Sequence, residues 1–407
     1  MADLLSVADA LSRVLKDAKP LPAENTALTD AHGRVLASDV AALRTQPPED
    51  LSAMDGYAVR ASTVAKLPAT LKVIGEVAAG HPFAGTVRDG EAARIFTGGV
   101  VPPGADTIVI QENTARSGDT VTVTAGAAPA GKHIRRAGLD FREGAVLLHK
   151  GRRLNDRDLM LAAAMNHPAL PVHRRPRVAV LGTGDELVPP GTTPGPGEIV
   201  YANGFALMAL IRAEGAELID LGIVPDQVDA TVKAIRKARA ERADVLLTSG
   251  GASVGDYDLV QKGLSSEGLA LSFWKVALRP GRPMMHGRLG DMQVIGLPGN
   301  PVSAFVCAVL FLVPLVRRLA GRADVEPKIE SATLGSDLPA NDERADYMRA
   351  KLMDGPGGTF LATPLPVQDS SMMAALANAD CLLIREPFAP AVKAGAQCAI
   401  LRLTPGF

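Results

Sequence analysis

The chain begins with apolar side chains spaced as on one face of a helix. They recur every three or four positions, at Leu4, Leu5, Ala8, Leu11, Val14 and Leu15, and so predict an amphipathic helix. A returning helix is predicted from Asp156 to His167, with Asn155 or Asp156 as its N-cap. Between these helices, from Pro47 to about Asp140, short apolar runs are broken by glycine and proline, a pattern typical of β-strands. We predict a discontinuous helical linker domain (residues 1–42 and 141–172) and an inserted β-rich domain (residues 43–140).

The next region alternates strand-like and helix-like segments. The predicted strands are Val178–Leu181, Glu217–Asp220, Val245–Thr248 and Gln293–Leu297. Helical spacing separates them, in Asn203–Gly215, in Asp226–Ala243 and from about Val302 onward. Strands that alternate with helices indicate a mostly parallel sheet covered on both faces, so we predict a three-layer α/β domain over residues 173–325. Short strands and turns then predict a small β-barrel-like domain over residues 326–407.

The composition argues against several classes of function. With 43 basic and 44 acidic residues, the 407-residue chain has a net charge of −1 and shows no charge signature for nucleic acid or a membrane surface. The longest apolar run, Val302–Val316, contains Ser303 and Pro314 and is shorter than the ~20 residues of a membrane span, which predicts a buried core helix. No secretory signal pattern opens the chain, and the cysteines lie in apolar surroundings. We expect a cytoplasmic protein with free thiols.

The segment Asp244–Asp258 combines a buried strand with a glycine-rich loop and a helix expected to begin near Asp256. Backbone N–H groups in such a loop, with the positive end of the helix dipole, suit a phosphate group. Asp256 and Asp258 lie beside this anion site, and carboxylates repel phosphate unless a divalent cation lies between them. The motif thus predicts Mg²⁺ as well as phosphate. The alternative is a tight strand-to-helix turn with a capping aspartate.

Polar motifs follow all four predicted strands of the α/β domain. They are Gly182-Thr183-Gly184-Asp185-Glu186, Val224-Pro225-Asp226, Ser249-Gly250-Gly251 and Leu297-Pro298-Gly299-Asn300-Pro301-Val302-Ser303. Ligands of an open α/β sheet bind outside the carboxyl ends of its strands, so these motifs are expected to form one site. None completes a Rossmann fingerprint or a Walker A sequence, which disfavours nicotinamide enzymes and P-loop NTPases. Taken singly, Glu186 could cap a loop, and Asp226 or Ser303 could cap a helix.

A basic run, Lys275–Pro283, is a candidate anion site. Pro280 and Gly281 predict a turn that brings Arg279 and Arg282 close together, and two guanidinium groups can bind an oxyanion. The alternative is a solvated surface turn.

The inserted domain contributes three weaker motifs. Asp55 and Thr97 each precede glycine, and the segment Arg135–Asp140 joins two guanidinium groups to a carboxylate. Each motif alone could be a turn with charged flanks. The histidines and cysteines show no zinc-binding spacing.

Taken in order, these segments resemble the molybdopterin molybdenumtransferase family of the MoeA type, which is related to the gephyrin E domain. The matching motifs span nearly the whole chain: Ser52–Arg60, Thr97-Gly98, Arg135–Asp140, Gly182–Leu187, Ser249–Asp258, Arg279–Pro283 and Leu297–Ser303. The resemblance implies insertion of molybdate into adenylylated molybdopterin, which yields molybdenum cofactor and AMP. It also implies an elongated homodimer of four-domain subunits, with each active cleft between the α/β domain of one subunit and the inserted domain of the other. Further implied partners are a molybdopterin adenylyltransferase and recipient molybdoenzymes.

The resemblance also assigns roles to residues. Asp55, Asp140, Glu186, Asp226 and Asp258 would surround the metal and the molybdate, and Thr97 would help to place the oxyanion. The expected ligands of Mg²⁺ are Glu186, Asp226, Asp256 and Asp258. Lys275, Arg279 and Arg282 would neutralise anion charge. The expected phosphate cradle and cleft walls are Gly182, Thr183, Gly184, Ser249, Gly250, Gly251, Ser253, Pro298, Gly299, Asn300, Pro301 and Ser303, with Ser371 from the terminal domain.

The sequence departs from the family pattern at a few positions. Arg279 and Arg282 stand where the family often has lysines, which changes the donor geometry but keeps the charge. Asp369-Ser370-Ser371-Met372 stands where a Ser-Gly pair usually precedes a helix, and either serine could fill that role. Leu51 stands where the family often has Asn.

These departures leave a second hypothesis, a non-catalytic carrier of molybdopterin or finished cofactor, or a gephyrin-like scaffold. The carboxylates favour the enzyme, because a carrier needs no ring of metal-binding carboxylates. An unrelated adenylyltransferase would leave the inserted domain without a role.

Overall fold

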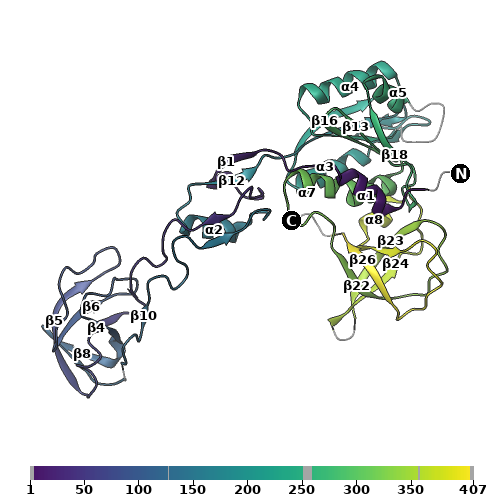
Figure 1. Ribbon diagram of the computed structural model, residues 1–407. Coiled ribbons are helices and arrows are strands. Elements are labelled where there is room, and N and C mark those ends of the chain that lie inside the picture. Colours follow the sequence, from purple (N-terminus) through teal and green to yellow (C-terminus); the bar gives the residue numbers. More distant parts are fainter. Residues whose placement is uncertain (1–3, 127, 251–258, 356–357, 404–407) are drawn as a thin grey trace.

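The computed structural model describes residues 4–126, 128–250, 259–355 and 358–403. Within these residues the chain forms four parts of an elongated molecule (Figure 1). The inserted β-rich part lies at one end, a narrow linker joins it to the α/β part, and the terminal β part packs beside the α/β part. The predicted multidomain α/β plus β fold class is confirmed by this organisation.

The first helix, α1 (Val7–Leu15), belongs by its contacts to the α/β part. It begins where the Ser6 hydroxyl accepts a hydrogen bond from the Asp9 N–H at 3.1 Å. Its buried side chains Ala10 and Val14 lie in the same hydrophobic cluster as α7 (Val313–Leu319). The prediction had placed residues 1–42 together in the linker domain. The structure differs because the apolar face of α1 is covered by the large α/β core and not by the small linker core.

The linker consists of an outgoing and a returning stretch that lie side by side. The pairs are β1 (Ala23–Ala27) with β12 (Ala169–His173), and β2 (Val40–Ala41) with β11 (Val146–Leu148), both antiparallel. A short 3₁₀ turn, η1 (Leu28–Asp30), follows β1. The returning helix α2 (Asp156–Ala164) starts at the predicted cap, Asn155, in a capping box with Asp158.

The inserted part is a six-stranded mixed sheet of order β7-β4-β6-β5-β9-β8. Two further short strands, β3 and β10, pair beside it. The strands are β3 (Leu51–Ser52), β4 (Gly56–Val59), β5 (Ala69–Val77), β6 (Glu91–Ile95), β7 (Thr107–Ile110), β8 (Thr114–Ser117), β9 (Thr120–Val123) and β10 (Ile134–Arg135), with a 3₁₀ turn η2 (Gln111–Asn113).

The α/β part contains a six-stranded sheet of order β16-β13-β17-β21-β20-β18. The first four of these strands are parallel, as predicted, and β20 runs antiparallel to its neighbours. Their bounds are β13 (Arg177–Thr183), β16 (Glu217–Val224), β17 (Val245–Ser249), β18 (Ala270–Trp274), β20 (Met285–Leu289) and β21 (Met292–Leu297). A small parallel pair, β14 (Leu187–Val188) with β15 (Ile199–Val200), lies in the connection after β13.

Helices cover both faces of this sheet, which gives the predicted three layers. On one face, α4 (Val228–Ala240) and α5 (Leu259–Ser266) share a core with the sheet. On the other face lie α3 (Asn203–Ala213), α6 (Pro301–Cys307) and α7, with α1 beside them.

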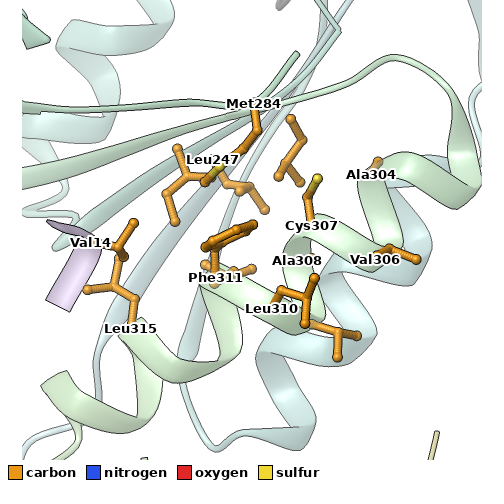
Figure 2. Packing of buried hydrophobic residues seen from close by; sticks show 14 of the residues in the cluster. Val14, Leu247, Met284, Ala304, Val306, Cys307, Ala308, Leu310, Phe311 and Leu315 are labelled. Atoms are coloured by element: carbon orange, nitrogen blue, oxygen red, sulfur yellow. The ribbon is translucent and has the colours of Figure 1, made fainter. Parts of the chain in front are cut away.

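The long apolar run forms the central helix of that second face. It starts as α6, passes through one π-helical segment, Ala308–Leu312 (η3), and continues as α7. The whole helix, Pro301–Leu319, has the length and composition of a membrane span, yet its most apolar window is 83% buried inside the protein. Phe311 is fully buried among Leu247, Met284 and Leu315 (Figure 2). The prediction of a buried core helix is confirmed.

The terminal part is a closed five-stranded barrel, in the order β23-β24-β22-β26-β25 with β25 pairing back to β23. The strands are β22 (Ile329–Leu334), β23 (Ala345–Asp354), β24 (Phe360–Pro364), β25 (Cys381–Arg385) and β26 (Gln397–Arg402), and a short helix α8 (Met373–Ala377) precedes β25. The barrel is joined to the α/β part by β19 (Leu278–Arg279), which pairs in parallel with β23. The predicted free thiols are confirmed for all three cysteines, Cys307, Cys381 and Cys398.

The central helix generates a stability prediction. Phe311→Ala should lower the free energy of unfolding of the α/β part by about 3–5 kcal/mol, because it removes a fully buried ring and leaves a cavity. Urea unfolding followed by circular dichroism measures this change. Phe388→Ala is the control, since that ring is 75% exposed and its loss should change stability little. Equal effects of the two substitutions would contradict the packing described for Phe311.

Candidate functional site

The carboxyl ends of the parallel strands converge at one edge of the sheet. In the register of the ladders, Gly182 lies opposite Ser249, Ser249 opposite Leu297, and Thr183 opposite Val224. The four predicted motifs therefore meet. Beside them lies a cleft of about 650 Å³, whose walls include the predicted residues Thr183, Glu186, Ser249, Gly250, Pro298, Gly299, Asn300, Pro301, Ser303 and Ser371.

Close approach of backbone and side chains shapes the floor of this cleft. Gly250 has φ +99°, and a β-carbon there would lie 2.5 Å from the Thr183 carbonyl oxygen, so only glycine fits. The ring of Tyr201 fills the space beside Gly182, where a β-carbon would lie 2.6 Å from the ring. Gly184 extends the strand end, with its N–H donating to the Val224 carbonyl at 3.4 Å.

One buried hydroxyl group in the cleft wall forms no hydrogen bond within the described residues. Thr183 is 4% exposed, and its Oγ1 makes no hydrogen bond to any described residue. A buried hydroxyl without a partner costs free energy, and such a group in a cleft commonly binds a ligand or water. Thr183 Oγ1 is therefore a candidate hydrogen-bonding group for a ligand or water in the cleft.

Asn203, at the start of α3, ties two of the converging motifs together. Its Nδ2 donates to Ser249 Oγ at 3.0 Å and to the Gly299 carbonyl at 2.7 Å. Ser303 is buried in the first turn of α6, whose N-cap is Asn300 and whose first residue is Pro301. Ser303 is therefore not the helix cap. The start of this long helix lines the cleft, and the positive end of its dipole favours an anion there.

Carboxylates gather at the adjoining strand ends. Asp226 donates its backbone N–H to Asp185 Oδ1 at 3.0 Å. The pKa of Asp226 is raised above 3.8, first by desolvation and then by the negative charges of Asp185 and Glu186, against the lowering effect of the backbone hydrogen bond. Asp226 does not cap α4, whose N-cap is Gln227. The carboxylate charge at this edge is therefore uncompensated within the described residues.

These carboxylates alone do not make a finished metal site. In residues 4–126, 128–250, 259–355 and 358–403, no group of three His, Cys, Asp or Glu side chains is arranged to hold a metal ion. The predicted ligands Asp256 and Asp258, like the predicted phosphate-cradle residues Gly251 and Ser253, lie outside the described residues. Glu186 and Asp226 offer the hard oxygen donors that Mg²⁺ requires.

The terminal barrel completes one wall of the cleft. Asn300 Nδ2 donates to Ser370 Oγ at 2.8 Å, and the Val302 N–H donates to the Ser370 carbonyl at 3.0 Å. Ser371 lines the cleft, and its hydroxyl donates to Asp369 Oδ1 at 2.6 Å. Ser370 therefore docks the barrel on α6, and Ser371 faces the cleft.

The basic run differs from its prediction. Arg279 is an interdomain tether, with ion pairs to Asp346 at 2.6 Å and Asp342 at 3.0 Å in the barrel part. Its charge is therefore already compensated, and the hydrogen bond to Asp346 is the main cause of its raised pKa. Arg282 is exposed, and neither it nor the half-buried Lys275 forms an ion pair with another described residue. Pro283, next to Arg282, lines the cleft.

The predicted residues of the inserted part lie far from this cleft within one chain (Figure 1). Asp55 Oδ1 accepts hydrogen bonds from the Thr97 N–H at 2.8 Å and the Thr97 hydroxyl at 2.7 Å. These bonds, the backbone one first, lower the pKa of Asp55. Asp140 is exposed at the base of the inserted part. The structure therefore pairs Asp55 with Thr97 but brings neither to the α/β cleft of the same chain.

The sequence reasoning assigned no role to Asp185, Tyr201 or Asn203. Tyr201 and Asn203 line the cleft, as does Pro283 at the end of the predicted basic run. Asp185 lies beside Asp226 at the same edge of the sheet. Asn203 carried a usable signal, since a polar side chain at a helix start next to a strand end faces the same edge of the sheet. No signal in the sequence indicated Tyr201, because its position depends on the space that Gly182 and Gly204 leave for its ring.

Comparison with known sequences covers nearly the whole chain. Residues 5–166 match the MoeA N-terminal region (domains I and II), residues 179–318 a probable molybdopterin binding domain, and residues 331–403 the MoeA C-terminal region (domain IV).

Among solved structures, a molybdopterin biosynthesis MoeA protein from Pyrococcus horikoshii superposes with a TM-score of 0.84 at 29% identity, over 99% of this chain and 100% of that one. The molybdopterin molybdenumtransferase of Haemophilus influenzae is 34% identical over 96% of this chain and 97% of its own length. Molybdopterin molybdenumtransferase 2 of Mycobacterium tuberculosis is 38% identical over 93% of this chain and 94% of its own length. The chain therefore belongs to the MoeA family of molybdopterin molybdenumtransferases, enzymes of molybdenum cofactor biosynthesis.

Proposed function

We propose that the chain inserts molybdate into adenylylated molybdopterin with the help of Mg²⁺, releasing AMP and molybdenum cofactor. One observation carries this proposal. Uncompensated carboxylates, Glu186 and Asp226, lie at the same sheet edge as an anion site built from Ser249, Gly250 and the start of α6. Carboxylates and a phosphate site can share a cleft only if a cation or a cationic group lies between them.

The chain's own residues would act by binding and orientation. Thr183 Oγ1 and the Ser249 hydroxyl would donate to the pterin phosphate, and the start of α6 would favour its charge. Glu186 and Asp226 would hold Mg²⁺, which supplies charge neutralisation and Lewis acidity when bound. No side-chain nucleophile is required, since the sulfur atoms of the substrate are themselves ligands for molybdenum. Catalysis would then rest on positioning and electrostatics.

We further propose a homodimer in which the inserted part of one subunit completes the cleft of the other. The proposal is supported by the position of Asp55 and Thr97, which form a hydrogen-bonded pair remote from the α/β cleft of their own chain. Exposed apolar side chains, such as Met160 on the linker at 71% and Leu139 at the end of the inserted part at 66%, are also suited to a subunit contact. We place the enzyme in the cytoplasm, where its free cysteines stay reduced.

The proposal is tested by AMP release from adenylylated molybdopterin. Glu186→Gln should lower molybdate- and Mg²⁺-dependent release by about a hundredfold or more, because it removes a charge that acts on the reacting groups. Glu198→Gln is the matched control, since Glu198 is exposed between β14 and β15, shortly after Glu186 in the chain, and lines no part of the cleft. Tight pterin binding by the wild type without any AMP release would leave the carrier hypothesis in its place.

The shared cleft predicts complementation between two inactive variants. Asp55→Asn and Glu186→Gln should each be inactive alone, but co-expressed chains should regain about a quarter of wild-type activity, since half of the dimers are mixed and each mixed dimer has one intact cleft. Activity per dimer, measured after purification of the mixture, gives this fraction. A mixture as inactive as its components would exclude a cleft shared between subunits.

The raised pKa of Asp226 predicts a pH-dependent stability effect. A carboxyl group whose folded-state pKa is raised destabilises the folded protein once it is ionised. Asp226→Asn should therefore raise the thermal midpoint of the metal-free protein at neutral pH, and the gain should vanish as the pH falls through the raised pKa toward 3.8. Mg²⁺ should stabilise the wild type more than the variant, because it binds the charged group. Calorimetry across this pH range measures both effects, and a pH-independent gain would show a different cause.

A further inference from the structure

A second and larger cavity adjoins the candidate substrate cleft. It has a volume of about 1010 Å³ and lies between α3 and α6 on one side and the barrel strands β23 and β24 with α8 on the other. Ala202, Asn203, Pro301 and Met373 line both this cavity and the cleft. The two spaces therefore lie next to each other along these residues, and we call the larger space the interdomain chamber.

The walls of the interdomain chamber are mainly apolar. Leu207, Phe305, Phe360 and Leu376 contribute aliphatic and aromatic surface, and the lining residue Met353 is 54% exposed. Apolar walls with aromatic rings suit a planar ring system of low charge, and methionine adapts its shape to such a ligand. The cleft, in contrast, presents hydroxyl groups, amides and carboxylates.

The polar groups of the chamber disfavour a phosphate there. Asp380 accepts hydrogen bonds from the Leu352 N–H at 3.0 Å and Lys351 Nζ at 3.2 Å, and the backbone bond is the leading cause that lowers its pKa. The chamber's arginine, Arg402, is already paired with Glu330 at 2.8 Å and stacks on Phe360 at 4.1 Å. An ionised Asp380 and the exposed Asp354 can accept hydrogen bonds from amino and hydroxyl groups, and they repel phosphate.

We infer that the interdomain chamber holds the adenosine half of the adenylylated substrate while its phosphates remain in the cleft. The inference rests on the proposed function. A purine is a planar ring with an amino group, and ribose offers hydroxyl donors, which match the apolar walls and the carboxylates. The difference in polarity between the chamber and the cleft thus sets the direction of the substrate. The terminal barrel then contributes directly to substrate binding, because it supplies one wall of the chamber.

Blocking the chamber without touching the cleft tests this inference. Ala206 is exposed on α3, lines the chamber and does not line the cleft. Ala206→Trp should fill part of the chamber and weaken AMP binding to the full-length protein at least about tenfold, measured by calorimetry. Binding of molybdopterin without the adenylate should stay at the wild-type level. Ala377→Trp, on α8 at the opposite wall, should have the same effect.

Ala209→Trp is the matched control, because Ala209 is exposed on the same helix and lines neither cavity. Thermal melts confirm that each variant is folded. The inference is overturned if the wild type does not bind AMP, if Ala206→Trp and Ala209→Trp bind it equally, or if Ala206→Trp changes only the oligomeric state. Molybdate-dependent AMP release by the wild type tests the proposed function separately, so the two failures are distinguishable.

Discussion

The parallel register of β13, β17 and β21 is the constraint on which the cleft depends. It sets Gly182 beside Ser249 and Ser249 beside Leu297, so every loop that follows these strands leaves from one edge. The register is maintained because these strands are buried on both faces. The helix Pro301–Leu319 packs against one of these faces, next to α3. A slip of one residue would turn Thr183 and Ser249 away from their present partners. The packing of the core therefore determines the geometry of the site.

The second constraint is electrostatic. The site gathers Asp185, Glu186 and Asp226 beside groups that attract anions, and the raised pKa of Asp226 reports the resulting repulsion. Such an arrangement is unfavourable in the free protein, and on the proposed function it would become favourable when a cation and an anionic substrate bind together. Binding of a cation there would explain why the carboxylates lie on loops after the strands and not in ion pairs. It would also explain why the pairs of arginine with carboxylate that do occur, such as Arg279 with Asp346, lie away from this edge.

The sequence predicted those parts of the molecule that depend on local pattern. The ends of β13, β17 and β21 were located to within two residues because buried parallel strands are continuous apolar runs, and the cap at Asn155 because capping depends on a few adjacent residues. The edge strand β16 contains Asp220 and runs four residues beyond its predicted end, to Val224. Contacts between distant segments were not predictable. Helix α1 has an apolar face, but the pattern does not say which core covers it. The ring of Tyr201 enters the cleft wall only because Gly182 and Gly204 leave room for it.

The two arginines of the basic run show how identical charges acquire different roles. Arg279 lies in β19, beside β23, where Asp342 and Asp346 compensate its charge and fix the barrel to the α/β part. Arg282 follows the turn and is exposed next to Pro283 in the cleft wall. A single exposed guanidinium contributes little to anion binding in water. On the proposed function, the buried hydroxyl groups and the dipole of the helix start would therefore provide most of the anion binding, and Arg282 would mainly steer the substrate toward them.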